Sequence, residues 1–265
     1  MASSAAYEAL AQAFWLEGVR AQFTLMGDGN MHWATALDGL GARTIHVRHE
    51  HCACAMAMGY AIATGKVGVA SVTCGPGLTQ TMTALATAVQ GNIPLVIFAG
   101  ESPIHASWYN QRIDQAPLVA ACGARYIAIH SLPRMLEQVC EAFLHAKLER
   151  QPVVLGMPFD LQHEPYRSLG DYVPSANLLP DVGRMMPDPS RVERAAEAIT
   201  RAERIIVLAG RGAMEADAQT ECEALADLTE GLLATTLPVR GLFDHHPFSL
   251  GIAGGFASEV AREAF

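Results

Sequence analysis

The chain has 265 residues, about half of them apolar and 17% charged, which suits one large α/β domain or two smaller domains. Its net charge of −9 argues against nucleic acid or a membrane surface as a partner, because both attract clustered Lys and Arg. The sequence shows no signal peptide and no apolar run near the ~18 residues of a membrane span, and its six cysteines, none in a CxxC pair, are typical of free thiols in a reducing cytoplasm.

Short apolar strands alternate with helices over residues 1–160. The pattern predicts a helix over 4–19, strands over 22–26, 44–47, 67–73, 94–100, 124–129 and 152–158, and helices over 30–37, 49–64, 78–90, 116–122 and 132–147. Apolar strands separated by helices imply a parallel sheet covered on both faces, and right-handed crossovers make it doubly wound. We therefore predict an α/β fold with a doubly wound, six-stranded parallel sheet.

The composition changes over residues 161–189, where prolines interrupt any regular element. They are Pro165, Pro174, Pro180, Pro187 and Pro189. This stretch is predicted to be an interdomain linker. A second α/β domain is expected over 190–265, with helices over 190–201 and 215–229 and strands over 204–210 and 232–236. Two or three strands cannot cover both faces of a sheet, so this second domain is expected to be incomplete.

Glu50 is the one carboxylate of the apolar stretch VRHEHCACAMAMGYA, which follows the second strand. A carboxylate in the first turn of a helix is favoured by the helix dipole, by roughly 0.3–1 kcal/mol, and this alone could explain it. The apolar neighbourhood favours a second interpretation. Burial favours the protonated form of a carboxyl group, and a protonated carboxyl group can exchange a proton with a bound ring nitrogen.

The turn TCGPG, comprising Thr73, Cys74, Gly75, Pro76 and Gly77, ends the third strand and opens a helix. Ligands of doubly wound folds bind beyond the carboxyl ends of the strands. The two glycines allow close backbone approach, which fits either a phosphate cradle at a helix N-terminus or a tight turn. The turn lacks both the P-loop lysine and the spacing of GxGxxG.

Two further turns follow strands. GDGN, residues 27–30, is interpreted either as a turn that caps the next helix or as a loop that directs Asp28 into the same cleft as Glu50. GRGA, residues 210–213, resembles a dinucleotide turn but lacks the third glycine, so it indicates nucleotide binding only weakly. The histidines are not spaced as metal ligands, and no metal site is predicted in this chain.

The stretch from residue 47 to 100 resembles the N-terminal pyrimidine-binding domain of thiamine-diphosphate enzymes of the acetolactate synthase and 2-oxo acid decarboxylase type. The motifs that carry the resemblance are HE after a strand, MAMGYA, ATGKVGV, GPG and NIPLV, in this order. A weaker similarity covers 4–158. Residues 190 to about 255, with GRGA and HPFSLGIAG, resemble the start of the family's central domain.

The resemblance implies a role for Glu50. In the family, this glutamate contacts the ring nitrogen of the cofactor's aminopyrimidine and promotes the tautomer that removes the thiazolium proton. The resulting ylid attacks a 2-oxo acid, so the cofactor supplies the carbanion chemistry. The resemblance also places the turn 75–77 against the pyrimidine rather than a phosphate, with Thr73, Cys74 and Met26 as further cofactor contacts.

Two substrate-site residues follow from the resemblance, one from each branch of the family. FTLMGDGNM, residues 23–31, is similar to the FGVPGDxNL of decarboxylases, which makes Asp28 an active-site aspartate. NQRID is similar to the FQEVD of acetolactate synthases, which makes Gln111 the active-site glutamine. Asn110 replaces the usual aromatic residue, and the histidine pair of decarboxylases is missing.

Together these features predict the N-terminal part of an acetolactate-synthase-like carboligase that acts on 2-oxo acids. Mg²⁺ and the cofactor's diphosphate would bind a domain that this sequence does not contain, so activity would need that domain or a second polypeptide. The resemblance implies a homo-oligomer, a dimer or tetramer, with the helix over 50–64 as its candidate interface. It leaves FAD binding open. The alternatives are a decarboxylase that releases an aldehyde, a non-catalytic regulatory subunit of the same fold, and a nucleotide-dependent oxidoreductase built on GRGA.

Overall fold

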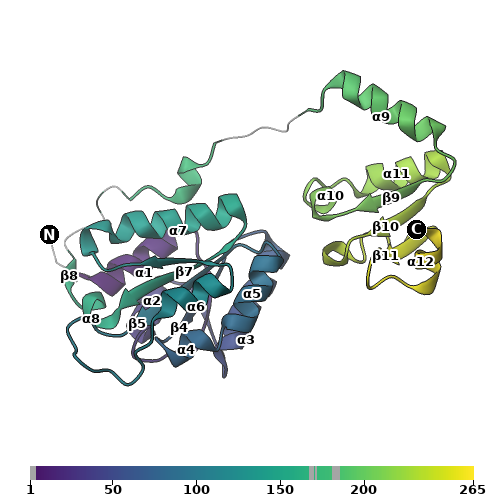
Figure 1. Ribbon diagram of the computed structural model, residues 1–265. Coiled ribbons are helices and arrows are strands. Elements are labelled where there is room, and N and C mark those ends of the chain that lie inside the picture. The colour runs from purple at the N-terminus through teal and green to yellow at the C-terminus, as the bar shows by residue number, and fades with distance from the viewer. Residues whose placement is uncertain (1–3, 167–169, 171, 181–185) are drawn as a thin grey trace. The chain divides into compact units, whose positions relative to one another are not determined.

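The computed structural model describes residues 4–166, 170, 172–180 and 186–265 (Figure 1). The chain forms two compact units, residues 1–181 and residues 182–265, and each is described by itself. Among the described residues, no helix combines the length and apolar character needed to cross a bilayer.

The first unit contains a six-stranded sheet and the helices that connect its strands. The strands are β2 (Ala21–Thr24), β3 (Arg43–His46), β4 (Gly68–Val72), β5 (Leu95–Glu101), β6 (Arg125–Ala128) and β7 (Pro152–Pro158). The helices are α1 (Ala6–Leu16), α2 (Met31–Gly39), α3 (Glu50–Thr64), α4 (Pro76–Thr79), α5 (Met82–Gln90), α6 (Gln115–Ala121), the 3-10 turn η1 (Leu132–Arg134), α7 (Met135–Glu149) and α8 (Phe159–Gln162). A two-residue strand β1 (Ser4–Ala5) pairs with β8 (Pro165–Tyr166).

The strand order is β3-β2-β4-β5-β7-β6, and every neighbouring pair is parallel. This confirms the predicted doubly wound, six-stranded sheet. The chain starts in β2, moves outward to β3, and returns to the other side of β2 to form β4. The carboxyl ends of β2 and β4 therefore lie at a topological switch point, where open α/β sheets bind ligands.

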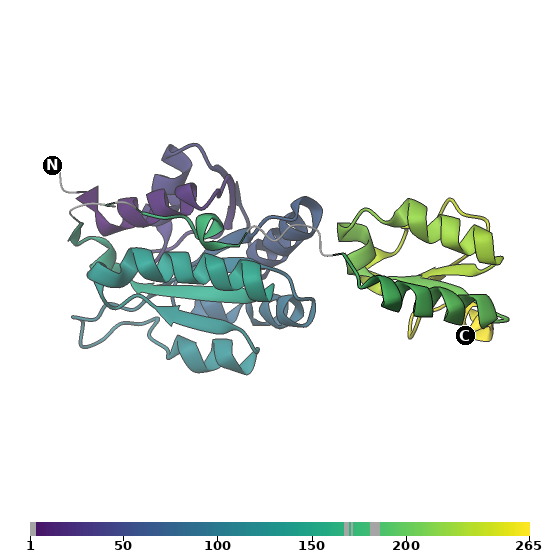
Figure 2. The same cartoon turned by 90° about the horizontal axis from the view of Figure 1, so that it is seen from above.

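Helices cover both faces of the sheet (Figure 2). Helices α1, α2 and α7 pack in one apolar cluster, and α3, α5 and α6 pack in another. Strand β5 contributes to both, because Val96 and Phe98 face the first cluster while Leu95 and Ile97 face the second. Alternation with a period of two residues is what a strand buried on both sides requires.

Two predicted segments differ from the structure. The helix expected over 78–90 is divided into α4 and α5, and the buried hydroxyl of Thr81, at the division, donates to the Leu78 carbonyl at 2.8 Å. The first part of the predicted linker 161–189 packs on the first unit: it forms α8 and β8, and the 3-10 turn η2 (Ser175–Leu178) contacts α7. Residues 167–169, 171 and 181–185 of that stretch lie outside the described residues.

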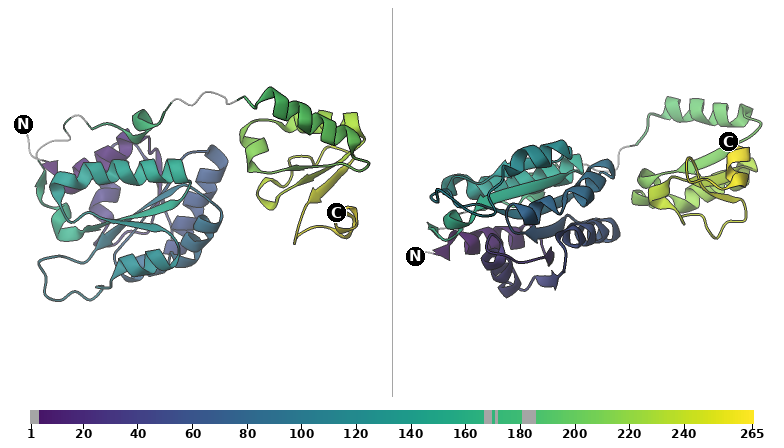
Figure 3. Two further views of the ribbon diagram at one scale, coloured as in Figure 1. Left: turned by 45° about the horizontal axis from the view of Figure 1, so that its top comes forward. Right: turned by 60° about the horizontal axis from the view of Figure 1, so that its bottom comes forward.

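The second unit has three parallel strands in the order β11-β10-β9, and Figure 3 shows this unit from two further directions. Its elements are α9 (Pro189–Arg201), β9 (Ile206–Ala209), α10 (Arg211–Glu215), α11 (Gln219–Thr229), β10 (Leu232–Thr235), the 3-10 turn η3 (Leu237–Val239), β11 (Ser249–Ile252) and α12 (Glu259–Ala264). Its buried core is small, and α9 buries none of its residues. A small parallel sheet of this kind fits the expected incomplete second domain.

Candidate active site

The loop after β2 is held in shape by a buried asparagine. Asn30 Nδ2 donates to Thr24 Oγ1 and to the Leu25 carbonyl, both at 3.2 Å, while its Oδ1 accepts from the Gly27 amide at 2.8 Å. Asn30 is fully buried, so these bonds satisfy groups that water cannot reach. The loop presents Asp28, at its exposed tip, beyond the carboxyl end of β2.

Glycines let this loop lie against the neighbouring loops. The Gly29 amide donates to Thr73 Oγ1 at 3.2 Å. A Cβ atom on Gly29 would lie 3.0 Å from Gly100 Cα, and one on Gly27 would lie 2.8 Å from Thr73 Cβ. Side chains at either position would push the loop away from the turn after β4, so the backbones can touch only because both residues are glycine.

The turn after β4 is seated on the backbone of the loop that follows β5. Gly75 has φ +60°, and a Cβ atom there would lie 1.9 Å from the Gln111 carbonyl oxygen. Glycine is therefore required twice, by conformation and by space. Pro76 is the first residue of α4 and is exposed, and Gly77 is buried beside the methyl group of Thr73. The turn is therefore packed tightly against its neighbours and presents Pro76 to the surface.

Glu50 lies at the same turn. It is the first residue of α3, following His49, whose Nδ1 accepts a hydrogen bond from the His51 amide at 3.1 Å. A Cβ atom built on Gly77 would be 3.6 Å from Glu50 Oε1. The carboxylate is half-buried rather than buried as expected, because α3 starts at the rim of the sheet between the exposed His49 and Pro76.

A polar cluster forms where the loops after β2, β4 and β5 meet. Cys74 Sγ lies 3.3 Å from Gln111 Oε1 and 3.9 Å from the Tyr109 hydroxyl, and Asp28 lies close enough to Tyr109 to influence its pKa. Burial raises the pKa of the Cys74 thiol, and burial together with Cys74 and Asp28 raises the pKa of Tyr109 to about 12. Both groups therefore keep their protons at neutral pH and can act as hydrogen-bond donors.

Tyr109 was missed by the sequence reasoning, although the pattern pointed close to it. The family resemblance places an aromatic residue at position 110, where this chain has the exposed Asn110. Tyr109, one position earlier, supplies the aromatic ring, which packs on Phe159 of α8 at 5.6 Å between ring centroids. The absence of an aromatic residue at position 110 was therefore a signal that pointed to the neighbouring positions.

Gln115 was also missed, and it connects three parts of the site. Its Oε1 accepts from the Gly75 amide at 2.8 Å, and its Nε2 donates to the Gly100 carbonyl at 3.1 Å and to the Tyr126 hydroxyl at 3.0 Å. Tyr126 in turn donates to Glu101, and burial followed by that carboxylate raises the pKa of Tyr126. Gln115 is nearly fully buried and belongs to no motif, so no sequence pattern signalled it.

Met26 is the predicted residue that the structure does not bring to this cluster. Its side chain is half-buried and packs against the apolar cluster below α1 and α2. It lines a separate hollow of about 450 Å³ together with Tyr7, Met31 and His32. Met26 lies in the same loop after β2 as Asp28, but its side chain packs against the core.

Two further points concern metal ligands and the GRGA turn. Across the described ranges, no group of three or more His, Cys, Asp or Glu side chains is placed to hold a metal ion. The GRGA turn lies in the second unit, where Gly210 precedes the short helix α10. Of the six free cysteines, Cys54 and Cys74 are buried, whereas Cys52 is exposed.

Comparison with known proteins gives this arrangement a family. Residues 5–121 match the model of the thiamine pyrophosphate enzyme N-terminal TPP binding domain, and residues 192–265 match that of the central domain. One relative is a "probable acetolactate synthase large subunit" of Methanocaldococcus jannaschii, 30% identical over 97% of this chain and 44% of its own length. Others are glyoxylate carboligase of Escherichia coli O157:H7, 30% identical over 96% of this chain and 43% of its own length, and "probable 2-ketoarginine decarboxylase AruI" of Pseudomonas aeruginosa, 32% identical over 85% and 40%.

A doubly wound sheet that carries a glutamate and a glycine-rich turn at its switch point, together with these matches, defines the class of protein. The chain belongs to the superfamily of thiamine-diphosphate-dependent enzymes, and within it to the acetolactate synthase type. The chain spans less than half the length of these relatives.

Proposed function

We propose that this chain supplies the pyrimidine-binding side of the active site of a thiamine-diphosphate-dependent carboligase that acts on 2-oxo acids. The observation that carries the proposal is the position of the Glu50 carboxylate beside the glycine-rich turn. Glu50 Oε1 would lie 3.6 Å from a Cβ atom on Gly77, so an acid lies directly beside the glycine-rich turn.

The residues at the turn fit the cofactor's aminopyrimidine. Gly75 and Gly77 pack tightly against Gln111 and Thr73, which fixes the turn, and the Glu50 carboxyl group lies beside it. When bound, thiamine diphosphate supplies a carbanion that adds to the carbonyl carbon of a 2-oxo acid. Glu50 would hold a proton at a ring nitrogen, and the turn would fix the ring beside it. Proton transfer of this kind contributes about 10²–10⁴-fold to rates.

The polar cluster beside the turn supports a substrate site. Gln111 Oε1 is occupied by the Cys74 thiol, which fixes the orientation of the amide. The Gln111 Nε2 group makes no hydrogen bond within the described residues, so it is free to donate to an oxygen of a 2-oxo acid. Asp28 and Tyr109, which lie near each other, would orient the second carbonyl compound or hold a proton near it.

Other parts of the proposal concern groups outside this chain. Mg²⁺ and the cofactor's diphosphate would bind a further domain or a second polypeptide, since the relatives are more than twice as long as this chain. We propose a homo-oligomer, dimer or tetramer, in which α3 contributes to the interface. Its outer side exposes 42% of Met56 and 61% of Ile62. Binding of FAD stays an open expectation of the family resemblance.

A second candidate is a decarboxylase that releases an aldehyde. Two observations favour it: Asp28 lies at the candidate site, and one relative is named a 2-ketoarginine decarboxylase. The two candidates differ in what happens after carbon dioxide is lost, because a carboligase joins the remaining fragment to a second carbonyl compound. Product analysis with one 2-oxo acid and a second carbonyl compound separates them.

The test compares wild type with Glu50→Gln in the full protein that contains this chain, with thiamine diphosphate, Mg²⁺ and a panel of 2-oxo acids. We expect activity to fall by ~10²-fold or more, as for general acid–base groups. Glu137→Gln is the matched control, because Glu137 is an exposed carboxylate at the start of α7. Undiminished activity of Glu50→Gln would refute the proposed role. If wild type binds the cofactor but has no turnover on any 2-oxo acid, the regulatory-subunit alternative gains support.

A further inference from the structure

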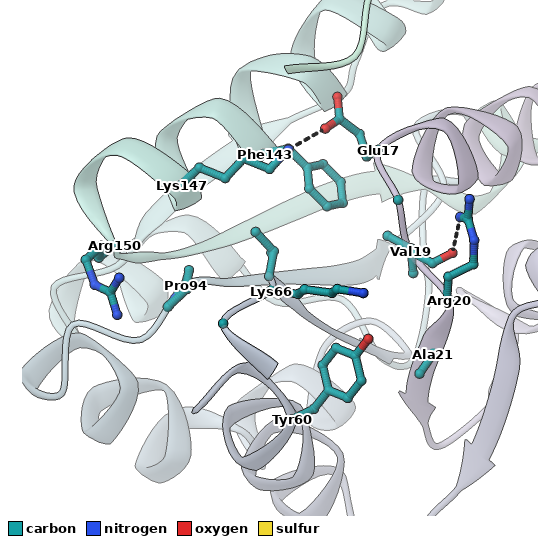
Figure 4. Close-up of a pocket in the computed structure, with 13 residues that line it drawn as sticks. Glu17, Val19, Arg20, Ala21, Tyr60, Lys66, Pro94, Phe143, Lys147 and Arg150 are labelled. Atoms are coloured by element: carbon teal, nitrogen blue, oxygen red, sulfur yellow. Dashed lines mark hydrogen bonds and ion pairs between the residues drawn. The ribbon is translucent and has the colours of Figure 1, made fainter. Parts of the chain in front are cut away.

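A hollow of about 560 Å³ lies at the edge of the sheet opposite the candidate active site (Figure 4). Its walls come from residues that precede β2, β4 and β5 and from the C-terminal half of α7. These segments carry the amino ends of the strands, whereas the candidate active site lies beyond their carboxyl ends. The volume is within the ~300–1,000 Å³ range of small-molecule pockets.

The hollow is rich in cations. It is lined by Arg20, Lys66, Lys147 and Arg150, and by one carboxylate, Glu17. Residues 66 and 147 are the only lysines in a sequence that otherwise uses arginine, and both line this hollow. Four cations against one carboxylate give a formal charge of +3, in a chain whose net charge is −9.

The one carboxylate is already neutralised. The Glu17 side chain is fully buried, and its Oε2 pairs with Lys147 Nζ at 3.1 Å. Its Oε1 accepts from the Tyr172 hydroxyl and from the Ser175 amide, both at 2.7 Å. Glu17 and Lys147 thus form a satisfied pair in the wall, and the charge of the remaining cations is not offset by it.

Helix dipoles account for part of the remaining charge. Helices α1, α3 and α7 end beside the hollow, at Glu17, Gly65 and Arg150. Each helix C-terminus carries the equivalent of about −0.5 charge, so the three together offset about half of the formal +3. The helix ends therefore offset only part of the charge, and Lys66 is left to pair with an anionic ligand.

Lys66 is the cation best placed to meet such a ligand. Its ammonium makes no hydrogen bond or ion pair within the described residues, and Figure 4 shows it extended into the hollow above Tyr60. Arg20, by contrast, is fixed: its Nη1 donates to the Trp15 carbonyl at 2.8 Å, and its guanidinium lies 3.6 Å from the centroid of the Trp15 ring. A fixed cation and one without a protein partner suit recognition of an anionic group.

The rest of the lining is apolar and open. Val19 and Phe143 are buried behind the cations, and Tyr60 forms the opposite wall. At Gly18 and Gly65 a Cβ atom would meet nothing within 4 Å, so the backbone leaves the entrance clear. An apolar body of the size of one ring could pack against these side chains while its charged group reaches the cations.

We propose that this hollow is a binding site for a small organic anion, with a phosphate or carboxylate group on a ring-sized apolar body. The site is separate from the candidate active site and does not depend on the proposed function. Phosphate and carboxylate share the chemistry that Lys66 and the arginines recognise, and the two are separated by the probes used in the test.

The two lysines provide the assay. The full chain is acetylated in the presence of phenyl phosphate or benzoate, with phenol and inorganic phosphate as comparison probes, and modification of Lys66 is followed by mass spectrometry. At a ligand concentration about ten times Kd, we expect Lys66 to react about tenfold more slowly. Whichever of phenyl phosphate and benzoate protects Lys66 more strongly identifies the preferred anionic group.

Variants test the charge directly. Isothermal titration calorimetry gives the affinity of each variant for the protecting probe. Lys66→Gln should weaken binding by roughly tenfold, as expected for loss of a charged hydrogen-bond donor, and Lys66→Arg should largely retain it. Arg134→Gln, which removes an exposed cation at the other end of α7, is the matched control and should bind as wild type. Protection by phenol equal to that by phenyl phosphate, unchanged affinity of Lys66→Gln, or no protection by either anion would overturn the proposal. Inorganic phosphate that protects as well as phenyl phosphate would overturn the assignment of an organic ligand.

Discussion

The two edges of the six-stranded sheet differ in charge and in construction. Beyond the carboxyl ends of the strands lie helix N-termini, glycine-rich turns and the carboxylates Asp28 and Glu50. Beside the amino ends lie helix C-termini, and the exposed cation Lys66 faces a hollow there. A parallel sheet with helical crossovers aligns all its helix dipoles, so each edge favours side chains of one sign. The carboxyl edge is built from backbone in close contact, and the amino edge from long side chains around open space.

The largest loss of stability is expected for a glycine substitution at the carboxyl edge. Gly75→Ala places a methyl group against the Gln111 carbonyl, where a Cβ atom would lie 1.9 Å away, and adds left-handed strain. Overpacking and strain together should destabilise the first unit by about 2–5 kcal/mol. Gly65→Ala, at the amino edge, has a similar φ of +69° but open space around it. Its cost should be only the strain, ~1–2 kcal/mol. Urea unfolding of the two variants measures the difference, and equal costs would mean that the turn is not held against the loop after β5.

A glutamine substitution at the carboxyl edge should cost somewhat less than Gly75→Ala. Gln115→Met removes three hydrogen bonds and leaves the Gly75 amide unpaired. Each unpaired buried group costs about 1–3 kcal/mol, so we expect a loss of about 2–4 kcal/mol and faster hydrogen exchange at the Gly75 amide. Gln151→Met, at the amino edge, removes bonds to Val89 and Asn92 at a less buried position and should cost at most ~1 kcal/mol. An unchanged exchange rate at Gly75 in Gln115→Met would show that Gln115 does not position the turn.

Alkylation rates of the cysteines test the burial of the carboxyl edge, and this experiment requires no substitution. Burial raises the pKa of Cys74, so less thiolate is present at neutral pH than in an ordinary cysteine, and alkylation, which requires the thiolate, is slowed. Its rate should therefore still be rising with pH above the usual range near 9. At pH 7.5 we expect iodoacetamide to modify the exposed Cys52 at least ~10-fold faster than Cys74. Peptide mapping after short exposures gives both rates, and rapid modification of Cys74 at pH 7.5 would contradict its burial.

Periodicity was enough to predict the strands and the doubly wound class. The strand Pro152–Pro158 has the predicted bounds, because a continuous apolar run starts after the polar Gln151. The position of that strand between β5 and β6 was not predictable from the pattern, since strand order depends on packing between distant segments. The break between α4 and α5 was missed because Thr81 interrupts the helix through a local side-chain bond that leaves the apolar period intact.

The candidate site was predictable where it rests on motifs. The turn 73–77, Glu50 and Gln111 come together in the structure as the spacing and the resemblance led us to expect. Tyr109 and Gln115 depend on how a long loop folds back on the sheet, and no local propensity encodes that. The half-buried state of Glu50 also lay beyond sequence reasoning, because apolar neighbours in the sequence of α3 face the core while its first residue stands at the rim.

The position of the two lysines has a practical consequence. Apart from the α-amino group, every amine of this chain lies at one rim of the first unit. Attachment to a sensor chip or resin through lysine would therefore tether the molecule by that rim and leave the opposite loops facing the solution. Thiamine analogues could then be passed over a uniformly oriented layer. The same tether would obstruct the hollow, so this layer would also serve as a control without binding at the hollow.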